Sequence, residues 1–398
     1  MTEVRLVMRY DFDNIIDRRN TGSAKWDFAD EFFGVKDILP MWVADMDFRS
    51  PPGVIEALKQ RAEHGIFGYY HVTESYYEAV MDWMKRRHHW EVQKDWFVLT
   101  PGVVTALSFI TAAFCQPGDE VIVQTPVYFP FFRVIENNHC KILDNPMCLD
   151  SGLYTMDMDD LRKKVTARTR MIILCNPHNP VGRVWGKEEL YAIGKFCAEK
   201  NILIVSDEIH GDFVYPGFTH VPFITVAPEF ADRTIVCTAA SKTFNLPGMQ
   251  TSNIIIPNGK LRQQMLQAME RYYIHNLNIM GLVATEVAYR TGESWLTQFL
   301  EYLQGNLHFL EQYIAERMPG VRIIPPQGTY LVWLDFRNAG INPARLDKFV
   351  REDAKVGLEA GTIFRAKEAG FERMNIACPR TILAEGLGRI EKALRMLS

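Results

Sequence analysis

Three short segments of the chain contain residue types that can form covalent bonds, hold protons and bind anions. Each follows a short apolar run of the kind that forms a buried strand. The segments are Asn176-Pro177-His178-Asn179-Pro180-Val181-Gly182, Ser206-Asp207-Glu208-Ile209-His210 and Ser241-Lys242-Thr243-Phe244-Asn245. Because the carboxyl ends of parallel strands meet at one edge of a sheet, we expect these side chains to converge there.

Each segment also has a purely structural interpretation when it is taken alone. The two Asn-Pro pairs, of which the second contains Asn179, are common in turns. Asp207 could cap a following helix. Lys242 could lie in a surface loop, although small neighbours at the end of an apolar strand argue against a solvated position. Because lysine is rarely buried without a partner, a buried Lys242 indicates an amine with a chemical role.

The combination of the three segments is more specific than any one of them. Pyridoxal phosphate needs a lysine amine for a Schiff base, an acid that holds a proton on the pyridine nitrogen, and a polar partner for its phenolic oxygen. Lys242, Asp207 and Asn179 supply these three groups. The residues therefore predict a site for pyridoxal 5′-phosphate.

The apolar runs predict the elements that position these residues. Short runs rich in β-branched residues occur at 120–124, 171–175, 202–205, 234–238 and 253–256. A helical pattern with one apolar face covers Lys187–Lys200. This alternation predicts an α/β fold with a mainly parallel sheet that helices cover on both sides.

The last part of the chain predicts a second, smaller α+β unit. Strands are expected at 321–325 and 329–335, and a final helix is expected from about Thr381. The apolar stripe of that helix consists of Leu383, Leu387, Ile390, Leu394 and Leu397.

These patterns divide the chain into a large and a small domain. The large, cofactor-binding domain is expected at 51–285. Residues 1–50 form an N-terminal segment that contributes to the small domain, whose main part is expected at 286–398. A ligand would bind where the two domains meet.

Composition excludes several classes of protein. The 398 residues carry 44 Lys and Arg against 48 Asp and Glu, a formal net charge of −4, so there is no basic excess for nucleic acid or an anionic membrane surface. Trp96–Gly118 has no charged residue and is long enough to cross a bilayer. Its Thr100-Pro101-Gly102 and Pro117-Gly118 predict a strand, a turn and a buried helix instead.

The cysteines and the first residues indicate where the protein works. Seven cysteines, without a C-x-x-C pair or a histidine cluster at ligand spacing, predict reduced thiols and no metal site. The first residues carry scattered charges and no apolar core, so we expect no secretory signal. Together these features predict a cytoplasmic protein.

The motifs N-P-H-N-P-V-G, S-D-E-I-H and S-K-T-F-N, in this order and spacing, resemble those of fold type I pyridoxal-phosphate enzymes of aminotransferase class I/II. The resemblance is closest to the subgroup of MalY/PatB-type cystathionine β-lyases and cystalysin-like C-S lyases. It extends over nearly the whole chain. The further matching segments are Lys25-Trp26-Asp27, Met41-Trp42-Val43-Ala44-Asp45-Met46-Asp47-Phe48, Phe67-Gly68-Tyr69, Thr125-Pro126-Val127-Tyr128 and Phe371-Glu372-Arg373-Met374-Asn375.

This resemblance implies how the cofactor is held. Lys242 would form the Schiff base, Asp207 would pair with the pyridine nitrogen, and Asn179 would bond the phenolic oxygen. Tyr128 would stack on the ring, and His210 stands near the phenolic oxygen, where the subgroup is expected to carry histidine. The residues expected at the phosphate are Gly102, Val103 and Val104, at the start of a helix, and Ser241.

The resemblance also implies roles outside the cofactor pocket. Arg373 would clamp the α-carboxylate of an amino-acid substrate, although an arginine near the last strand could instead be a solvated residue. Tyr69 would reach the cofactor phosphate or the substrate of a neighbouring subunit. The implied assembly is a homodimer with shared active sites.

The chain departs from the family pattern in two places. Ala239 and Gln250 stand where many relatives carry Ser or Thr and Arg for the phosphate, so binding should depend on backbone donors and on Thr251 or Ser252. The subgroup tends to have a glycine-rich run before the carboxylate arginine. Here Arg365 and Lys367 are expected to add charge and bulk beside the substrate entrance.

The expected activity is that of a C-S β-lyase, which cleaves L-cystathionine, L-cystine or a related S-substituted cysteine to a thiol, pyruvate and ammonia. An aminotransferase, acting on an amino acid and a 2-oxo acid, is the alternative because it would use the same residues. A regulator that binds pyridoxal phosphate with little turnover is the third hypothesis. The intact set of Lys242, Asp207 and Arg373 argues against it.

Overall fold

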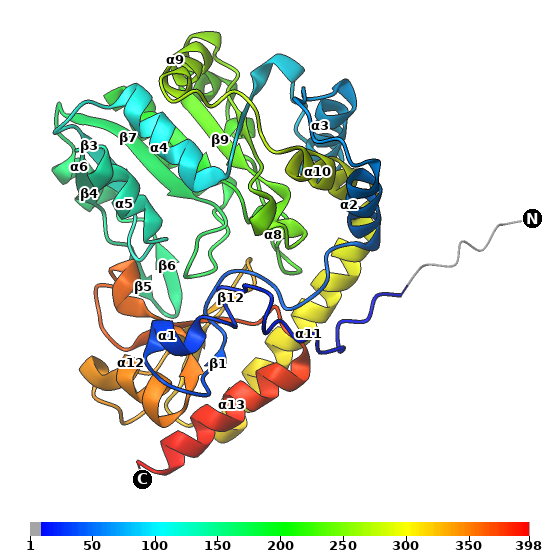
Figure 1. The fold of residues 1–398 in the computed structure, drawn as a ribbon. Coiled ribbons are helices and arrows are strands. Elements are labelled where there is room, and N and C mark those ends of the chain that lie inside the picture. The colour runs from blue at the N-terminus through cyan, green and yellow to red at the C-terminus, as the bar shows by residue number, and fades with distance from the viewer. Residues whose placement is uncertain (1–8, 398) are drawn as a thin grey trace, which may run out of the picture.

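A seven-stranded sheet forms the centre of the larger part of the molecule (Figure 1). The structure is a computed structural model, and it describes residues 9–397. The strand order is β2-β10-β9-β8-β7-β3-β4. The strands are β2 (Phe97–Thr100), β3 (Glu120–Val123), β4 (Lys141–Asp144), β7 (Thr169–Cys175), β8 (Leu203–Asp207), β9 (Thr234–Thr238) and β10 (Ser252–Ile255).

The predicted α/β fold with a mainly parallel sheet is confirmed, with one antiparallel strand. β4, β3, β7, β8 and β9 pair in parallel, whereas β10 runs antiparallel to both β9 and β2. A parallel neighbour needs a crossover, which is usually a helix. The connection from β9 to β10 contains only the four-residue helix α8 (Ala240–Thr243) and a short 3-10 turn, and the chain returns beside β9.

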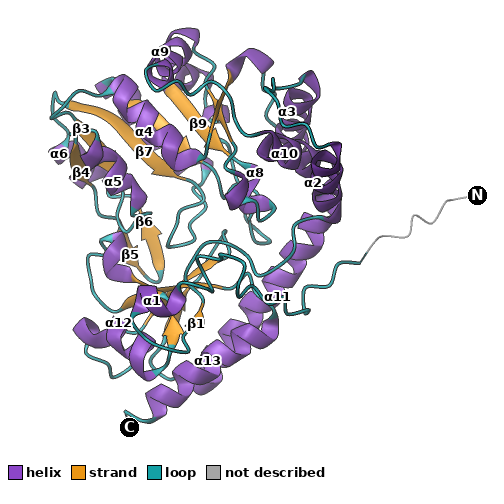
Figure 2. Ribbon diagram, in the orientation of Figure 1, coloured by secondary structure: helices purple, strands orange, loops and turns teal. Residues whose placement is uncertain are grey.

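Helices cover both faces of this sheet because successive residues of its strands point to opposite sides. In β7, Met171 and Ile173 pack under α4 (Val103–Phe114), α5 (Pro130–Asn137) and α9 (Gly259–Glu270). Ile172 and Leu174 pack with residues of α6 (Met158–Lys164) and α7 (Lys187–Lys200) on the other side. The predicted helix at Lys187–Lys200 is therefore confirmed. Figure 2 shows this layered arrangement.

The uncharged segment Trp96–Gly118 folds as predicted, into β2, a turn and the buried helix α4. No helix within residues 9–397 is long and apolar enough to span a membrane.

Three further helices flank one end of the seven-stranded sheet (Figure 1): α2 (Pro52–His64), α3 (Glu74–His88) and α10 (Ile279–Thr291). α10 packs against both α2 and α3.

A four-stranded antiparallel sheet organises the smaller part, in the order β11-β12-β15-β14. Its strands are β11 (Arg322–Ile324), β12 (Leu331–Asp335), β14 (Glu359–Ala360) and β15 (Phe371–Asn375). The strands predicted at 321–325 and 329–335 correspond to β11 and β12. The long helix α11 (Glu293–Arg317), yellow in Figure 1, runs from beside α2 into this part.

The end of the chain folds close to prediction. The last helix, α13, covers Arg380–Arg395, and its Leu383, Leu387 and Ile390 are buried. Leu397 does not continue the buried stripe; it is exposed because the helix ends before it. The remaining elements are α1 (Ala29–Phe33), β1 (Leu39–Pro40), β5 (Cys148–Asp150), β6 (Leu153–Thr155), α12 (Leu346–Lys348) and β13 (Val356–Gly357).

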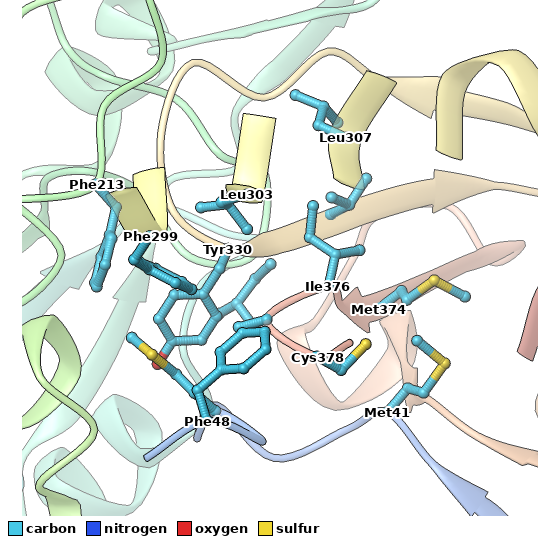
Figure 3. Packing of buried hydrophobic residues seen from close by; sticks show 14 of the residues in the cluster. Met41, Phe48, Phe213, Phe299, Leu303, Leu307, Tyr330, Met374, Ile376 and Cys378 are labelled. Carbon is cyan, nitrogen blue, oxygen red and sulfur yellow. The ribbon is translucent and has the colours of Figure 1, made fainter. Parts of the chain in front are cut away.

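The N-terminal segment joins the smaller part through strand pairing and apolar packing. β1 pairs in parallel with β13, and Met41 and Phe48 belong to the same buried cluster as residues of α11, β12 and β15 (Figure 3). This pairing is consistent with a small unit that both ends of the chain build. The domain limits at residues 50 and 285 stay a prediction.

A buried ion pair holds the N-terminal segment in place. Nζ of Lys25 lies 2.7 Å from Oδ2 of Asp47, and the two side chains are only 1% and 3% exposed. Oδ1 of Asp47 accepts hydrogen bonds from Arg18 and from the indole of Trp26, both at 2.8 Å. Burial alone would raise the pKa of Asp47, but Lys25, Trp26 and Arg18 together lower it.

Replacing Asp47 with Asn should lower the free energy of unfolding by about 3 kcal/mol, because the buried Lys25 ammonium loses its nearer counter-ion and keeps only Asp45 at 3.8 Å. Equilibrium urea unfolding at pH 7 measures this loss. Glu91→Gln is the matched control, since the Lys85–Glu91 pair is exposed and should contribute almost nothing. Because the pKa of Asp47 is lowered, the contribution should disappear as the pH falls through that lowered pKa. Equal effects of the two substitutions would contradict the prediction.

Candidate active site

The three motif segments meet at one edge of the large sheet. Parallel pairing places Cys175, at the end of β7, beside Asp207 of β8, and Asp207 beside Cys237 of β9. The loops that follow these strands open onto a cavity of about 280 Å³. The predicted site residues that line it are Gly102, Val103, Val104, Tyr128, Asn179, Asp207, His210, Ser241 and Lys242.

Two predicted site residues lie outside the lining of this cavity. Arg373 of β15 reaches its edge, where its guanidinium donates a hydrogen bond of 2.9 Å to Oδ1 of Asn179. Tyr69 is fully exposed on the surface of the chain. The expectation that Tyr69 serves a neighbouring subunit stays a prediction.

Lys242 is held by a backbone carbonyl of the N-terminal segment. Its Nζ donates a hydrogen bond of 2.7 Å to the oxygen of Ala44, which also accepts one of 2.9 Å from the hydroxyl of Tyr330. Burial lowers the pKa of Lys242 to about 8, although Asp45 acts in the opposite direction. At pH 7 roughly a tenth of this amine is therefore unprotonated and able to act as a nucleophile or base, far more than for an ordinary lysine.

Asp207 presents a buried carboxylate to the same cavity. It is 4% exposed, and the backbone N–H of Ile209 donates to its Oδ1 at 3.2 Å. No Lys, Arg or His side chain within residues 9–397 forms an ion pair with it, and burial raises its pKa to about 7. A carboxylate in this position favours a ligand that brings a positively charged N–H.

The start of α4 provides donors for an anion. Gly102 adopts φ of +100°, which favours glycine, and its own N–H donates to the carbonyl of Thr100 at 2.8 Å. The free donors are therefore those of the first helical turn, beginning with Val103 and Val104, rather than that of Gly102. This detail corrects the expectation that all three residues offer backbone donors to a phosphate.

The structure also distinguishes between the two hydroxyl residues expected near the phosphate. Thr251 lines the cavity together with Gln250. Ser252 lies within the sheet, where its hydroxyl bonds the side chain of Thr100 at 2.7 Å. Thr251 is therefore the hydroxyl at the cavity wall, although its Oγ1 donates a hydrogen bond of 3.2 Å to the carbonyl of Met249.

His210 is buried and neutral. Burial, assisted by the positive charges of Lys242 and Arg373, holds its pKa well below the usual value. Its ring packs against Tyr330 with a centroid distance of 5.9 Å, and Nδ1 has no hydrogen-bond partner. An unpartnered buried nitrogen at the wall of the cavity is a candidate for contact with a ligand.

A carboxylate that the sequence did not reveal faces Arg373. Glu359 of β14 lies opposite Arg373 in the antiparallel pairing with β15, and the two side chains form a buried ion pair. A second guanidinium contact goes to the carbonyl of Trp42 at 2.8 Å. Glu359 could have been noticed only as an acid within the apolar run Val356-Gly357-Leu358-Glu359-Ala360, because the sequence does not reveal the register of β14 and β15.

The two charged residues expected beside the substrate entrance occupy different places. The Arg365 guanidinium lies 4.1 Å from the ring centroid of Phe132 and pairs with Glu136 at 3.2 Å. Phe132 and Glu136 line a cavity of about 620 Å³ that also contains Glu359. Lys367 lines a different cavity, next to Arg337, and its expected position beside the substrate entrance stays a prediction.

Comparison with known proteins places the chain in a family. Residues 36–390 match the model of aminotransferase class I and II. The chain belongs to this family. It is 43% identical over 384 residues to cystathionine beta-lyase PatB of Bacillus subtilis (strain 168), covering 96% of this chain and 99% of the relative.

Solved structures agree with the fold over almost the whole chain. Cystalysin from Treponema denticola, whose crystal structure contains a pyridoxal 5′-phosphate cofactor, superposes with a TM-score of 0.95 at 37% identity, covering 98% of this chain and 100% of that chain. The pyridoxal-phosphate-bound C-S lyase from Staphylococcus hominis, complexed with L-cycloserine, gives a TM-score of 0.91 at 34% identity, covering 97% and 98%. The predicted resemblance is therefore confirmed.

Asp207→Asn should change how the stability of the cofactor-free protein depends on pH. The native pKa of about 7 exceeds the usual 3.8, so the native state holds this proton more tightly and stability falls as the pH rises between these values. The amide introduced by the substitution does not titrate, so the variant lacks this loss of stability. The difference in melting temperature, variant minus wild type, should therefore increase from pH 5 to pH 8. Differential scanning fluorimetry measures it. Asp150→Asn, at an exposed carboxylate, is the control. Parallel curves for wild type and Asp207→Asn would contradict the assignment.

Proposed function

We propose that the protein is a pyridoxal-phosphate-dependent carbon-sulfur β-lyase, which cleaves L-cystathionine, L-cystine or a related S-substituted cysteine to a thiol, pyruvate and ammonia. The observation that carries this function is one cavity that combines the Lys242 amine with the Asp207 carboxylate. The chain around this cavity matches a cystathionine β-lyase over 96% of its length.

The residues of the cavity fit pyridoxal 5′-phosphate. The carboxylate of Asp207 forms no ion pair with a Lys, Arg or His side chain of the described residues and would hold a proton on the pyridine nitrogen. The first turn of α4 offers donors for the phosphate, and the Thr251 hydroxyl would have to turn away from the carbonyl of Met249 to add another. Asn179 and the unpartnered Nδ1 of His210 offer polar contacts for the phenolic oxygen. Tyr128 supplies an aromatic face at the cavity wall.

When bound, the cofactor supplies an aldehyde that links to amines and a ring that accepts the electron pair left at Cα. The protein's own residues bind the substrate and move its proton. Arg373 would hold the α-carboxylate, and the Lys242 amine would take the Cα proton onto Nζ. The pKa of about 8 suits this step, because the unprotonated amine is available near neutral pH.

We propose a homodimer with shared active sites in the cytoplasm. An exposed apolar loop supports the dimer: Ile66 and Phe67 are 67% and 60% exposed, and Tyr69 next to them is fully exposed. In a dimer this loop would be covered, and Tyr69 would reach the partner's site. The seven free cysteines support a reducing compartment such as the cytoplasm.

The reaction type is tested by the products of purified enzyme loaded with pyridoxal phosphate. L-Cystathionine or L-cystine should yield pyruvate and ammonia in equal amounts without any added 2-oxo acid, because loss of the Cβ substituent needs no amino acceptor. Lactate dehydrogenase and glutamate dehydrogenase assays measure the two products. If activity depends strictly on a 2-oxo acid, with glutamate or alanine as product, the protein is the aminotransferase of the alternative hypothesis.

Arg373→Ala should raise the KM for the sulfur amino acid about 10- to 150-fold, because a charge-assisted carboxylate contact of about 1.5–3 kcal/mol is lost. Steady-state kinetics with L-cystine provide the measurement. Arg365→Ala is the matched control, since this guanidinium is bound by Glu136 and Phe132 and should change KM little. If Arg365→Ala raises KM more than Arg373→Ala does, Arg365 rather than Arg373 binds the substrate carboxylate.

A further inference from the structure

The guanidinium of Arg373 is already bound on several sides. Nη1 of Arg373 donates a hydrogen bond to Asn179, and Nη2 donates one to the carbonyl of Trp42. The carboxylate of Glu359 forms an ion pair with the same Nη2. A bidentate clamp for a substrate carboxylate needs two parallel N–H donors. The carboxylate of Glu359 therefore competes for the surface that the proposed function assigns to the substrate.

We propose that Glu359 is a displaceable counter-ion of Arg373, which takes the place of the substrate α-carboxylate in the resting site and thereby sets how tightly that carboxylate binds. This inference rests on the proposed function, which assigns Arg373 to the carboxylate. Glu359 is a specificity-determining residue in this scheme and takes no part in proton transfer.

Burial explains why the resting site needs such a counter-ion. Arg373 is 2% exposed and Glu359 is 8% exposed, so the positive charge has little access to solvent. A buried charge without a partner strongly destabilises a protein. Burial also raises the pKa of Glu359 despite Arg373 and Lys242 nearby, so the carboxylate is not strongly stabilised as an anion.

A second carboxylate cannot join the pair without repulsion. Two negative charges at one guanidinium repel each other strongly where water is largely excluded. An incoming α-carboxylate must therefore displace Glu359 from Arg373. The affinity for the substrate is consequently lower than Arg373 alone would give.

The structure offers space for the displaced side chain. Glu359 lines the cavity of about 620 Å³, which lies beside the guanidinium and contains Trp42, whose carbonyl binds Arg373. Arg133 and Arg351 line the same cavity and provide positive charge. The backbone of Glu359 is fixed by its pairing in β14, so movement of the side chain alone is sufficient.

The test uses 3-(methylthio)propanoate, which carries the carboxylate and thioether of a substrate but no amine that could react with the cofactor. Isothermal titration calorimetry measures its binding to the pyridoxal-phosphate-loaded enzyme. Glu359→Gln should bind it about tenfold more tightly than wild type, because the competing charge is removed. The same variant should have a lower melting temperature, because Arg373 loses its resting partner.

Controls separate this role from a merely structural one. Glu368→Gln, at a carboxylate that pairs with the partly exposed Arg337, should leave binding unchanged. Glu359→Asp keeps the charge on a shorter side chain and should bind the probe with intermediate affinity. In steady-state assays with S-methyl-L-cysteine, Glu359→Gln should lower KM and change kcat less.

Several outcomes would overturn the inference. Unchanged or weaker probe binding in Glu359→Gln would show that Glu359 orients Arg373 rather than competing for it. If that variant does not fold, unchanged or weaker binding in Glu359→Asp overturns the inference equally. If Arg373→Ala binds 3-(methylthio)propanoate as tightly as wild type, Arg373 does not bind the carboxylate, and the inference fails. If tighter binding is found in an enzyme that releases no pyruvate from any sulfur amino acid, the lyase proposal fails and the counter-ion role stands.

Discussion

Parallel pairing of β7, β8 and β9 is the constraint on which the site depends. It brings the ends of three strands to the same level, so Asn179 after β7, Asp207 at the end of β8 and Lys242 in the helix after β9 face one cavity. The strands are apolar on both faces because helices cover both sides of the sheet. A polar residue at such a strand end is therefore placed in a poorly hydrated position, where its pKa shifts.

The N-terminal segment completes the site through its backbone carbonyls. The oxygen of Trp42 binds Arg373, and the oxygen of Ala44 binds Lys242. Further carbonyls of this segment are bound by side chains of Asn245 and Asn375, so the connection between β9 and β10 shares one support with β15. The buried Lys25–Asp47 pair anchors the same segment, which links the stability of the N-terminus to the geometry of the site.

Burial acts on the charged groups of the site in opposite directions. It lowers the pKa of Lys242 to about 8 and raises that of Asp207 to about 7, so each group changes protonation close to neutral pH. The buried guanidinium of Arg373 forms an ion pair with Glu359. A site built in this way can exchange one anion for another without leaving the buried guanidinium unpaired.

The sequence by itself determined the local features of this protein. Short continuous apolar runs predicted β3, β7, β8, β9 and β10, and helical patterns with one apolar face predicted α7 and α13. The motifs around Asn179, Asp207 and Lys242 predicted the cofactor, because these signals lie within a few neighbouring residues. The parallel sheet also predicted that these three motif segments converge at one edge. Only the tertiary structure decided the remaining pairings between distant segments. The antiparallel direction of β10, the choice of Thr251 over Ser252, and Glu359 opposite Arg373 all depend on strand pairing. Pairing is set by the packing of the whole chain, and no local pattern of residues contains that information.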